Sequence, residues 1–360
     1  MKILQIIDSL GIGGAEKLIV DTVPLMVKQG NIVDVLLLNG EQTPFYDELS
    51  SKNCCKIYSL GRSYYNPIYI FKIIKYFRQY DIIHVHLFPA QYYAVLSKML
   101  SFSKTKLIFT EHNTRNSRMD NPKFRLLEQF IYKGFSKIVC ITQEVKNSLL
   151  NKLKLNKDKL VVINNGINIQ EISNTIPENR NNFGYTESDK LLIMVAGFRE
   201  QKDQETVIKT LPLLSDHYKL ILVGDGARRE NLESLVQELN LQNRVNFLGI
   251  RSDVYRLIKM SDIAVLSSHW EGFGLSAAEA MACGKPTIVS NVQGLAQVVN
   301  NGGLLFEKGN STDLKRQIIS LEDINHYKLI SNKCYKKSLE YDFINMVNSL
   351  LDLYQSECKK

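Results

Sequence analysis

The chain has 360 residues and a mass of 41.2 kDa, about twice the size of an ordinary domain, which predicts two domains. With 44% hydrophobic and 23% charged residues, its composition excludes the disordered and fibrous classes. No apolar run reaches the roughly 18–20 residues of a membrane-spanning helix, and Asp8 interrupts the apolar N-terminus too early for a secretory signal. We therefore expect a cytoplasmic protein whose six cysteines, none in a C-x-x-C pair, are free thiols.

The net charge of +8 is unevenly distributed along the chain. Residues 1–160 carry 23 Lys and Arg against 13 Asp and Glu, whereas residues 161–360 carry 22 against 24. The basic surplus favours an anionic partner for the first half, such as a membrane surface or an anionic substrate. A merely solvated surface accounts for the composition equally well.

Short runs rich in Ile, Val and Leu alternate with amphipathic helical patterns. The predicted strands are, in chain order, residues 3–7, 32–38, 82–86, 107–110, 138–141, 161–164, 191–196, 219–223, 245–248, 263–266 and 287–290. The predicted helices include residues 16–29, 68–79, 123–134, 204–214, 229–239 and 254–260, with a last helix at about 343–355. This alternation predicts an α/β fold with parallel sheets covered by helices on both faces.

The alternating pattern is interrupted once, at residues 168–190, a polar stretch without periodicity that is typical of a linker. We therefore expect an N-terminal domain of residues 1–167, joined by the C-terminal helix at about 343–360, and a C-terminal domain of residues 168–342. Each is expected to be doubly wound and Rossmann-like, and the two to meet at a cleft. In such sheets ligands bind beyond the carboxyl ends of the strands.

The strongest pattern is HWEGFGLSAAEAMACGKP at residues 269–286, directly after a predicted strand. Its glycines allow a ligand close to the backbone, and the helix that follows offers N–H groups and a positive dipole end to an anion. Glu271 before the loop and Glu279, expected in the first helical turn, can both face one bound molecule and accept hydrogen bonds from sugar hydroxyls. Alternatively, Ser276-x-x-Glu279 is a capping box that only begins the helix.

A second pattern, AGFREQKD at residues 196–203, follows the first strand of the second domain. A diphosphate leaving group gains negative charge as its glycosidic bond breaks, and without a metal, fixed cations must stabilise it. Arg199 and Lys202 supply a planar guanidinium and a point charge for this purpose. The alternative is that both are solvated surface charges.

Two glycine-rich loops resemble dinucleotide fingerprints but depart from them. In GIGGAE, at residues 11–16, Glu16 stands where the third glycine is needed, and Arg229 takes that place after GDG at residues 224–226. The second strand ends at Asn39 instead of the acid expected on an NAD ribose. NAD binding is therefore disfavoured.

Three histidines lie on or just after strands of the first domain. His112 follows a strand end, where a lone histidine is either a ligand contact or a structural hydrogen-bond partner. His84 and His86 share one face of a strand, as metal ligands would. No Cys, Asp or Glu set completes a metal site, and no D-x-D pair occurs in the chain. We expect no bound metal and interpret His84 and His86 as structural or acceptor-side residues.

These segments, taken in order, resemble glycosyltransferase family 4, a family of retaining enzymes with the GT-B fold. EGFGLSAAEAMACGKP resembles the family's E-x7-E signature. Three further segments resemble family motifs: VGDG at 223–226, RVNFLG at 244–249 and NGIN at 165–168. The match extends over nearly all of the second half and is looser over the first. The resemblance implies two Rossmann-like domains facing a central cleft, the first on the acceptor side and the second binding the donor.

The resemblance also implies roles for the carboxylates and the glycine loop. Glu279 would bind the nucleotide ribose, and Glu271 would lie near the anomeric centre of the transferred sugar. Backbone amides of Phe273, Gly274 and Leu275 would contact the sugar and phosphate.

Further donor contacts are implied for the segment at residues 196–203 and for the glycine-rich loop at residues 11–16. Lys202 matches the family's diphosphate-binding lysine. The family's arginine usually stands at the place of Gly197, so Arg199 replaces it only if the turn redirects its side chain. Gly13 and Gly14 would open toward the donor phosphates, with a plain tight turn as the alternative.

Two regions complete the implied site. His112 would contact the donor sugar or its β-phosphate from the first domain. The residues at and after Gly249, namely Ile250 and Arg251, would lie near the nucleotide base.

The implied function is retaining transfer of a sugar from a nucleotide diphosphate donor, with a UDP-sugar favoured and a GDP-sugar second. The acceptor would be a saccharide or lipid-linked saccharide of surface polysaccharide biosynthesis. Its hydroxyl would attack the anomeric carbon of the donor from the front side, and no metal or other cofactor is implied. The basic, aromatic-rich first half fits peripheral contact with an anionic membrane at its inner face, although the amphipathic pattern at residues 68–80 also suits a helix packed on its own sheet. Alternatives are a sugar-nucleotide epimerase of the same fold and a non-enzymatic sugar-binding protein; no nucleic-acid-binding module is recognised.

Overall fold

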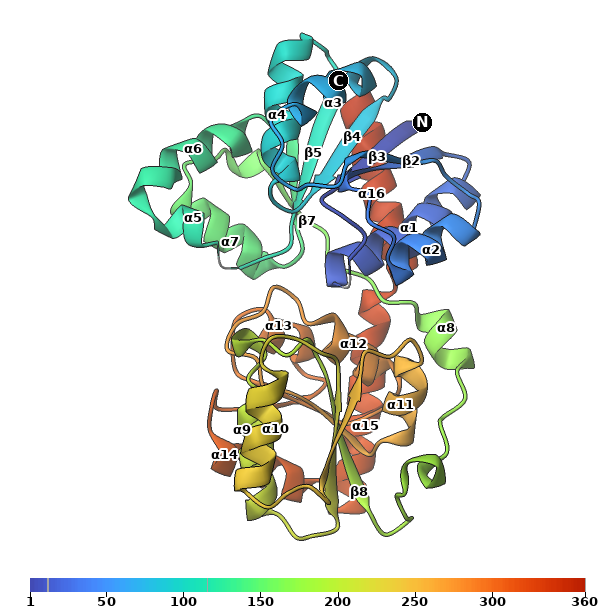
Figure 1. Ribbon diagram of the computed structural model, residues 1–360, viewed down its shortest axis with the longest axis vertical. Coiled ribbons are helices and arrows are strands. Elements are labelled where there is room, and N and C mark those ends of the chain that lie inside the picture. Colours follow the sequence, from blue (N-terminus) through green and yellow to red (C-terminus); the bar gives the residue numbers. More distant parts are fainter. Residues whose placement is uncertain (12, 115, 360) are drawn as a thin grey trace. The chain divides into compact units, whose positions relative to one another are not determined.

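A computed structural model describes residues 1–11, 13–114 and 116–359 (Figure 1). The chain divides into two compact units. Unit 1 comprises Met1–Gly166 together with Phe343–Lys360, and unit 2 comprises Ile167–Asp342. Both are α/β units with parallel sheets, as the alternating sequence pattern predicts.

The core of unit 1 is a seven-stranded parallel sheet with the order β3-β2-β1-β4-β5-β6-β7. The order reverses at β1, as in doubly wound folds, so the crossover helices cover both faces. The strands are β1 (Lys2–Ile7), β2 (Ile32–Asn39), β3 (Ile57–Gly61), β4 (Ile82–His86), β5 (Lys106–Glu111), β6 (Lys137–Cys140) and β7 (Leu160–Val162). The sequence pattern predicts all of these except β3. That strand lies at the sheet edge and only one of its five residues is buried, so it lacks the continuous apolar run of its neighbours.

Four of the helices of unit 1 lie at the positions predicted from the sequence, near residues 16–29, 68–79, 123–134 and 343–355, and the others do not correspond to a predicted helix. The helices of this unit are α1 (Gly14–Lys28), α2 (Pro44–Ser51), α3 (Tyr69–Ile74), α4 (Ala90–Ser101), α5 (Ser117–Asp120), α6 (Pro122–Lys133), α7 (Gln143–Lys152) and α16 (Phe343–Cys358). The helix predicted at 68–79 is shorter than expected, because Lys75–Arg78 forms a 3-10 turn after α3. The C-terminal helix α16 lies beside α1 (Figure 1), where Gln29 Nε2 donates to Asn348 Oδ1 at 3.0 Å.

Unit 2 contains a six-stranded parallel sheet with the order β10-β9-β8-β11-β12-β13. Its strands are β8 (Lys190–Val195), β9 (Tyr218–Val223), β10 (Val245–Gly249), β11 (Ile263–Leu266), β12 (Thr287–Ser290) and β13 (Leu304–Phe306). The short edge strand β13 is missed by the sequence pattern. The helices are α8 (Ile169–Asn174), α9 (Gln204–Thr210), α10 (Arg229–Glu238), α11 (Val254–Met260), α12 (Leu275–Ala282), α13 (Leu295–Val299), α14 (Ser311–Ser320) and α15 (Ile324–Ser338).

The stretch at 168–190 is not the plain linker that its composition predicts. It contains α8 and a 3-10 helix at Arg180–Phe183, and two of its asparagines are the N-caps of these helices. Asn168 and Asn179 each accept a backbone N–H through their side chains. Arg180 ties the segment to unit 2 by an ion pair with Asp262 at 2.9 Å.

The cysteines and the helix lengths bear on two expectations from the sequence, free thiols and the absence of a membrane-spanning helix. All six cysteines are free thiols, as their spacing predicts. Within the described ranges, each helix is too short or too polar to cross a bilayer.

Candidate functional site

The carboxyl ends of β8 and β11 bring Lys202 and Glu271 together in unit 2. The two strands are parallel neighbours, so the loops that follow them leave the same edge of the sheet. Lys202 Nζ lies 2.7 Å from Glu271 Oε2, and the side chains are only 20% and 13% exposed. An ion pair therefore joins two sequence patterns that lie 69 residues apart.

The two loops are also held together through their main chains. His269 N–H donates to the carbonyl of Gln201 at 2.7 Å, and Gln201 Nε2 donates to the carbonyl of Trp270 at 2.9 Å. Ser267 Oγ donates to the carbonyl of Asp203 at 2.6 Å. Because these bonds lie on both sides of Lys202 and just before Glu271, they set the position of the ion pair before any ligand binds.

Helix α12 begins one residue after a glycine in the left-handed conformation. Gly274 is the N-cap, with φ of +87°, and a Cβ atom there would lie 2.3 Å from Leu295 Cδ2. Only glycine satisfies both the backbone angle and the close packing. The G-F-G turn thus places the N-terminus of α12 beyond the carboxyl end of β11. The free N–H groups of a helix N-terminus are able to bind an anion.

We expect Gly274→Ala to lower the free energy of unfolding by about 2–5 kcal/mol, because left-handed strain costs about 1–2 kcal/mol and overpacking about 1–3 kcal/mol. Gly284→Ala is the matched control, since Gly284 has φ of +71° but open space around its Cβ position. It should cost about 1–2 kcal/mol from strain alone. Urea denaturation measures both values. Equal losses would show that Leu295 moves aside and that packing does not require glycine.

Glu279 lies deeper in α12 than the sequence suggests. The helix starts at Leu275, so Glu279 is in the second turn and not the first. The capping-box alternative is wrong, because Gly274 is the N-cap and Ser276 lies inside the helix. Glu279 Oε1 instead accepts a hydrogen bond from the Tyr255 hydroxyl at 3.2 Å. Tyr255, on α11, is a candidate site residue that sequence reasoning missed, since only the packing of α11 against α12 brings it here.

The other two residues of this turn, Phe273 and Leu275, differ in how far their side chains are buried. The Phe273 side chain is buried, with its ring edge-on to Tyr341 at 5.1 Å between centroids. Only its backbone is therefore available to a ligand. Leu275 is half-buried at the start of the helix.

Arg199 is exposed just before the 3-10 turn Glu200–Lys202. A Cβ atom on Gly197 would lie 3.8 Å from Arg199 Nε. The Arg199 side chain therefore passes close to the point where a side chain at position 197 would begin.

Two glycines keep the neighbouring strand ends close to this loop. Gly224, after β9, has φ of +136°, and its Cβ would lie 2.1 Å from the carbonyl oxygen of Ala196. Its N–H donates to the carbonyl of Gly249 at 2.8 Å. Ile250 follows, 58% exposed despite being aliphatic. The ends of β8, β9 and β10 thus lie side by side, with an apolar side chain presented to solvent.

Unit 1 carries the candidate residues of the first loop. Gly13 is the N-cap of α1, with an extended backbone that any residue can adopt, and Gly14 is the first helical residue. A Cβ on Gly13 would lie 2.3 Å from Glu16 Oε2. Glycine therefore leaves room here for the Glu16 carboxylate. Ile12, within the same motif, lies outside the described residues.

His112 lines a cavity of about 300 Å³ at the carboxyl ends of β1, β4 and β5, together with Asp8, Glu111 and Arg118. Burial raises the pKa of both carboxyls, Asp8 and Glu111, to about 7. The Asp8 carboxylate accepts the backbone N–H of Ala90 at 3.0 Å. Sequence reasoning missed these acids, although each ends or directly follows a strand.

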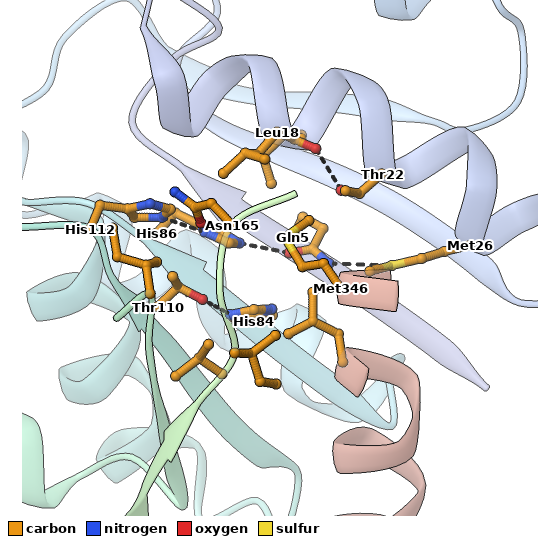
Figure 2. Close-up of a pocket in the computed structure, with 15 residues that line it drawn as sticks. Gln5, Leu18, Thr22, Met26, His84, His86, Thr110, His112, Asn165 and Met346 are labelled. Carbon is orange, nitrogen blue, oxygen red and sulfur yellow. Dashed lines mark hydrogen bonds between the residues drawn. The ribbon is translucent and has the colours of Figure 1, made fainter. Parts of the chain in front are cut away.

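His84 and His86 lie inside unit 1, beside a small cavity of about 30 Å³ (Figure 2). Their ring centroids are 4.3 Å apart, as expected for one strand face. His84 Nε2 bonds Thr110 Oγ1 at 2.7 Å, and its Nδ1 bonds the hydroxyl of Tyr354 on α16 at 2.5 Å. These contacts favour a structural role. Across the described ranges, no three His, Cys, Asp or Glu side chains are placed to hold a metal ion.

Comparison with known protein families agrees with the two units. Residues 12–171 match the family model described as "Glycosyltransferase Family 4", and residues 175–337 match "Glycosyl transferases group 1". The two matched segments correspond to most of unit 1 and most of unit 2.

Individual proteins are similar to this chain at low identity. N-acetyl-alpha-D-glucosaminyl L-malate synthase of Bacillus anthracis is 32% identical over 67% of this chain and 65% of its own length. UDP-Gal:alpha-D-GlcNAc-diphosphoundecaprenol alpha-1,3-galactosyltransferase of Escherichia coli is 25% identical over 89% and 88%. The crystal structure of Anabaena Alr3699/HepE with UDP and glucose superposes with a TM-score of 0.88 at 21% identity, covering 99% of this chain and 100% of that one. The GT-B fold expected from the sequence is thereby confirmed.

Proposed function

Because the chain belongs to glycosyltransferase family 4, we propose that it transfers a sugar from a UDP-sugar to a saccharide or lipid-linked saccharide, with retention of the anomeric configuration. A GDP-sugar is the second candidate donor. The observation that carries this proposal is the Lys202–Glu271 ion pair at the strand ends of unit 2, next to the glycine turn that begins α12. It combines a fixed cation, a carboxylate and helix N–H groups in one place.

The proposed chemistry assigns the leaving diphosphate to the cations. Lys202 and, beside the Gly197 position, Arg199 would neutralise the charge that develops on the diphosphate oxygens. The backbone N–H groups of Phe273, Gly274 and Leu275 would add to this at the helix start. We propose that these groups provide the stabilisation and that no metal is needed.

The two carboxylates are proposed to hold the sugar and the ribose. Glu271 would stabilise the positive charge of the oxocarbenium-like anomeric carbon, and its ion pair with Lys202 sets its position. Glu279, oriented by the Tyr255 hydroxyl, would accept hydrogen bonds from the ribose hydroxyls. Gly249 and Ile250 would lie near the base, and Gly13 and Gly14 near the phosphates.

The choice of donor and acceptor follows the relatives. The Escherichia coli relative is named for a UDP-galactose donor and a diphosphoundecaprenol-linked acceptor, and HepE is crystallised with UDP and glucose. We therefore propose a UDP-sugar and a lipid-linked acceptor in surface polysaccharide biosynthesis.

The decisive experiment incubates the purified protein with a panel of UDP- and GDP-sugars, with and without diphosphoundecaprenol-linked saccharides, in EDTA. Release of the nucleoside diphosphate only when acceptor is present, with an α-linked product from an α-linked donor, supports the proposal. Conversion of donor alone to an epimer favours the epimerase alternative. Binding of donors without turnover favours a sugar-binding protein. If EDTA abolishes the activity, the proposal that no metal is needed is wrong, and the proposed sugar transfer itself is unaffected.

Contact with a membrane is proposed through α6, not through the helix at 68–80. The latter packs on its own sheet, since Tyr69, Ile73 and Phe77 are buried. On α6, Leu126 is 75% exposed and Phe130 46% exposed.

The charges of α6 complement an anionic surface. Lys123, Arg125 and Lys133 are exposed, whereas the acid of this helix, Glu128, is buried and paired with Arg118 at 2.7 Å. Apolar side chains framed by cations fit an anionic bilayer at its inner face.

We expect Leu126→Ser/Phe130→Ser to weaken binding to phosphatidylglycerol-containing vesicles about tenfold or more, because each side chain loses its transfer into the interface. Vesicle cosedimentation at low and high salt measures this. Ile324→Ser/Leu329→Ser, which changes two exposed aliphatic residues of unit 2, should bind like the wild type. If the wild type ignores anionic vesicles at low salt, or if both double variants bind equally, α6 is not a membrane contact.

A further inference from the structure

A chain of hydrogen bonds runs through the interior of unit 1 and ends at His112 (Figure 2). Gln5 Nε2 faces Met26 Sδ at 4.0 Å, and Gln5 Oε1 lies 2.9 Å from His86 Nε2. His86 Nδ1 in turn lies 3.2 Å from His112 Nε2. Gln5 and His86 are 2% and 6% exposed, so this chain is closed to bulk water.

The direction of each proton follows from the chemistry of the first member. A thioether sulfur carries no hydrogen and can only accept, so the NH₂ group of Gln5 faces Met26 and its carbonyl oxygen faces His86. That oxygen also only accepts, so His86 Nε2 carries a hydrogen. A neutral His86 therefore has a bare Nδ1, which accepts a hydrogen bond from His112 Nε2–H.

The imidazoles are neutral for two reasons. Burial lowers the pKa of His86 well below its usual range and that of His112 to about 4. The rings are also close, with centroids 4.3 Å apart for His84–His86 and 5.5 Å for His86–His112, so a charge on one disfavours charge on the next. With its single hydrogen on Nε2, neutral His112 has a lone pair on Nδ1. Within the described residues, no hydrogen bond involves that atom.

We propose that Gln5 and His86 are positioning residues that hold His112 in the Nε2–H tautomer, so that Nδ1 accepts a hydrogen bond from a sugar hydroxyl. The identity of the ligand rests on the proposed function. A bare Nδ1 accepts from a hydroxyl but cannot donate to a phosphate oxygen. Of the two ligands implied by the resemblance, sugar and β-phosphate, the hydrogen-bond chain selects the sugar.

The tautomer is measured on the wild-type protein without any substrate. Long-range ¹H–¹⁵N correlation spectra of protein labelled at histidine should show His112 neutral, with its hydrogen on Nε2, between pH 6 and 8. A hydrogen on Nδ1, or an imidazolium in this range, overturns the proposal. Because no donor or acceptor is present, this result stands or falls separately from the proposed function.

The role of the chain is tested with Gln5→Met, which keeps the side-chain size but removes the acceptor for His86. We expect His112 to populate both tautomers and kcat/KM to fall about 5- to 10-fold, the value of one hydrogen bond, in the same direction as His112→Ala. Thr22→Val is the control, because Thr22 lines the same small cavity and its hydroxyl donates to the carbonyl of Leu18, outside the hydrogen-bond chain. An unchanged His112 signal in Gln5→Met, or an equal change in Thr22→Val, overturns the positioning role.

Discussion

Glu271→Gln is expected to lose at least about 100- to 1000-fold in kcat while UDP binding is retained. The amide matches the carboxylate in size and can still accept from Lys202, so the loops should keep their places. Only the negative charge is lost, and this charge is proposed to act on the cationic transition state more than on the bound donor. UDP should bind equally well or somewhat more tightly, since a negative charge near the diphosphate is removed.

Product formation under saturating donor and calorimetric titration with UDP measure the two quantities. Glu340→Gln is the matched control, because Glu340 also pairs with a lysine, Lys337, at 2.6 Å in unit 2, but its own side chain is 61% exposed. It should behave like the wild type. Normal turnover in Glu271→Gln would remove Glu271 from the mechanism.

Lys202→Met is expected to lower kcat/KM by about 100- to 1000-fold and also to weaken UDP binding. Methionine keeps the aliphatic stem but removes the cation that the proposal places on the diphosphate. It also removes the lysine from beside Glu271, whose side chain is only 13% exposed, so this carboxylate repels the incoming diphosphate more strongly. Both variants thus lose turnover, but only Lys202→Met weakens UDP binding.

Lys337→Met is the control for this substitution, because Lys337 is also paired with a glutamate and, at 19%, is about as little exposed as Lys202. The double variant Lys202→Met/Glu271→Gln should bind UDP more tightly than Lys202→Met alone, since the repelling charge is gone. Independent, additive effects on UDP affinity would contradict a functional coupling between the two side chains.

The sheets illustrate what local sequence can predict. Central strands such as β1 and β4 are buried on both faces, so most of their residues are apolar. The edge strands β3 and β13 are held by pairing with a single neighbour and carry fewer buried side chains, so no long apolar run marks them. In the sequence, polar capping residues such as Asn168 and Asn179 cannot be distinguished from the polar residues of a linker, because the helices that they begin are short.

The candidate site shows the same division. Lys202 and Glu271 were each predicted from motifs, because glycine turns and cations after strands have recognisable spacing. Their pairing, the second-turn position of Glu279 and its contact with Tyr255 depend on which strands and helices are neighbours.

The sequence by itself determined the α/β class, the family and the residue types available for chemistry, because strand periodicity and local motifs are short-range properties. Only the tertiary structure decided which of those residues meet, which acids are buried and which nitrogen of His112 carries its hydrogen. Those features arise from contacts between segments far apart in the chain, such as Gln5 with His86, and from the loss of water around them.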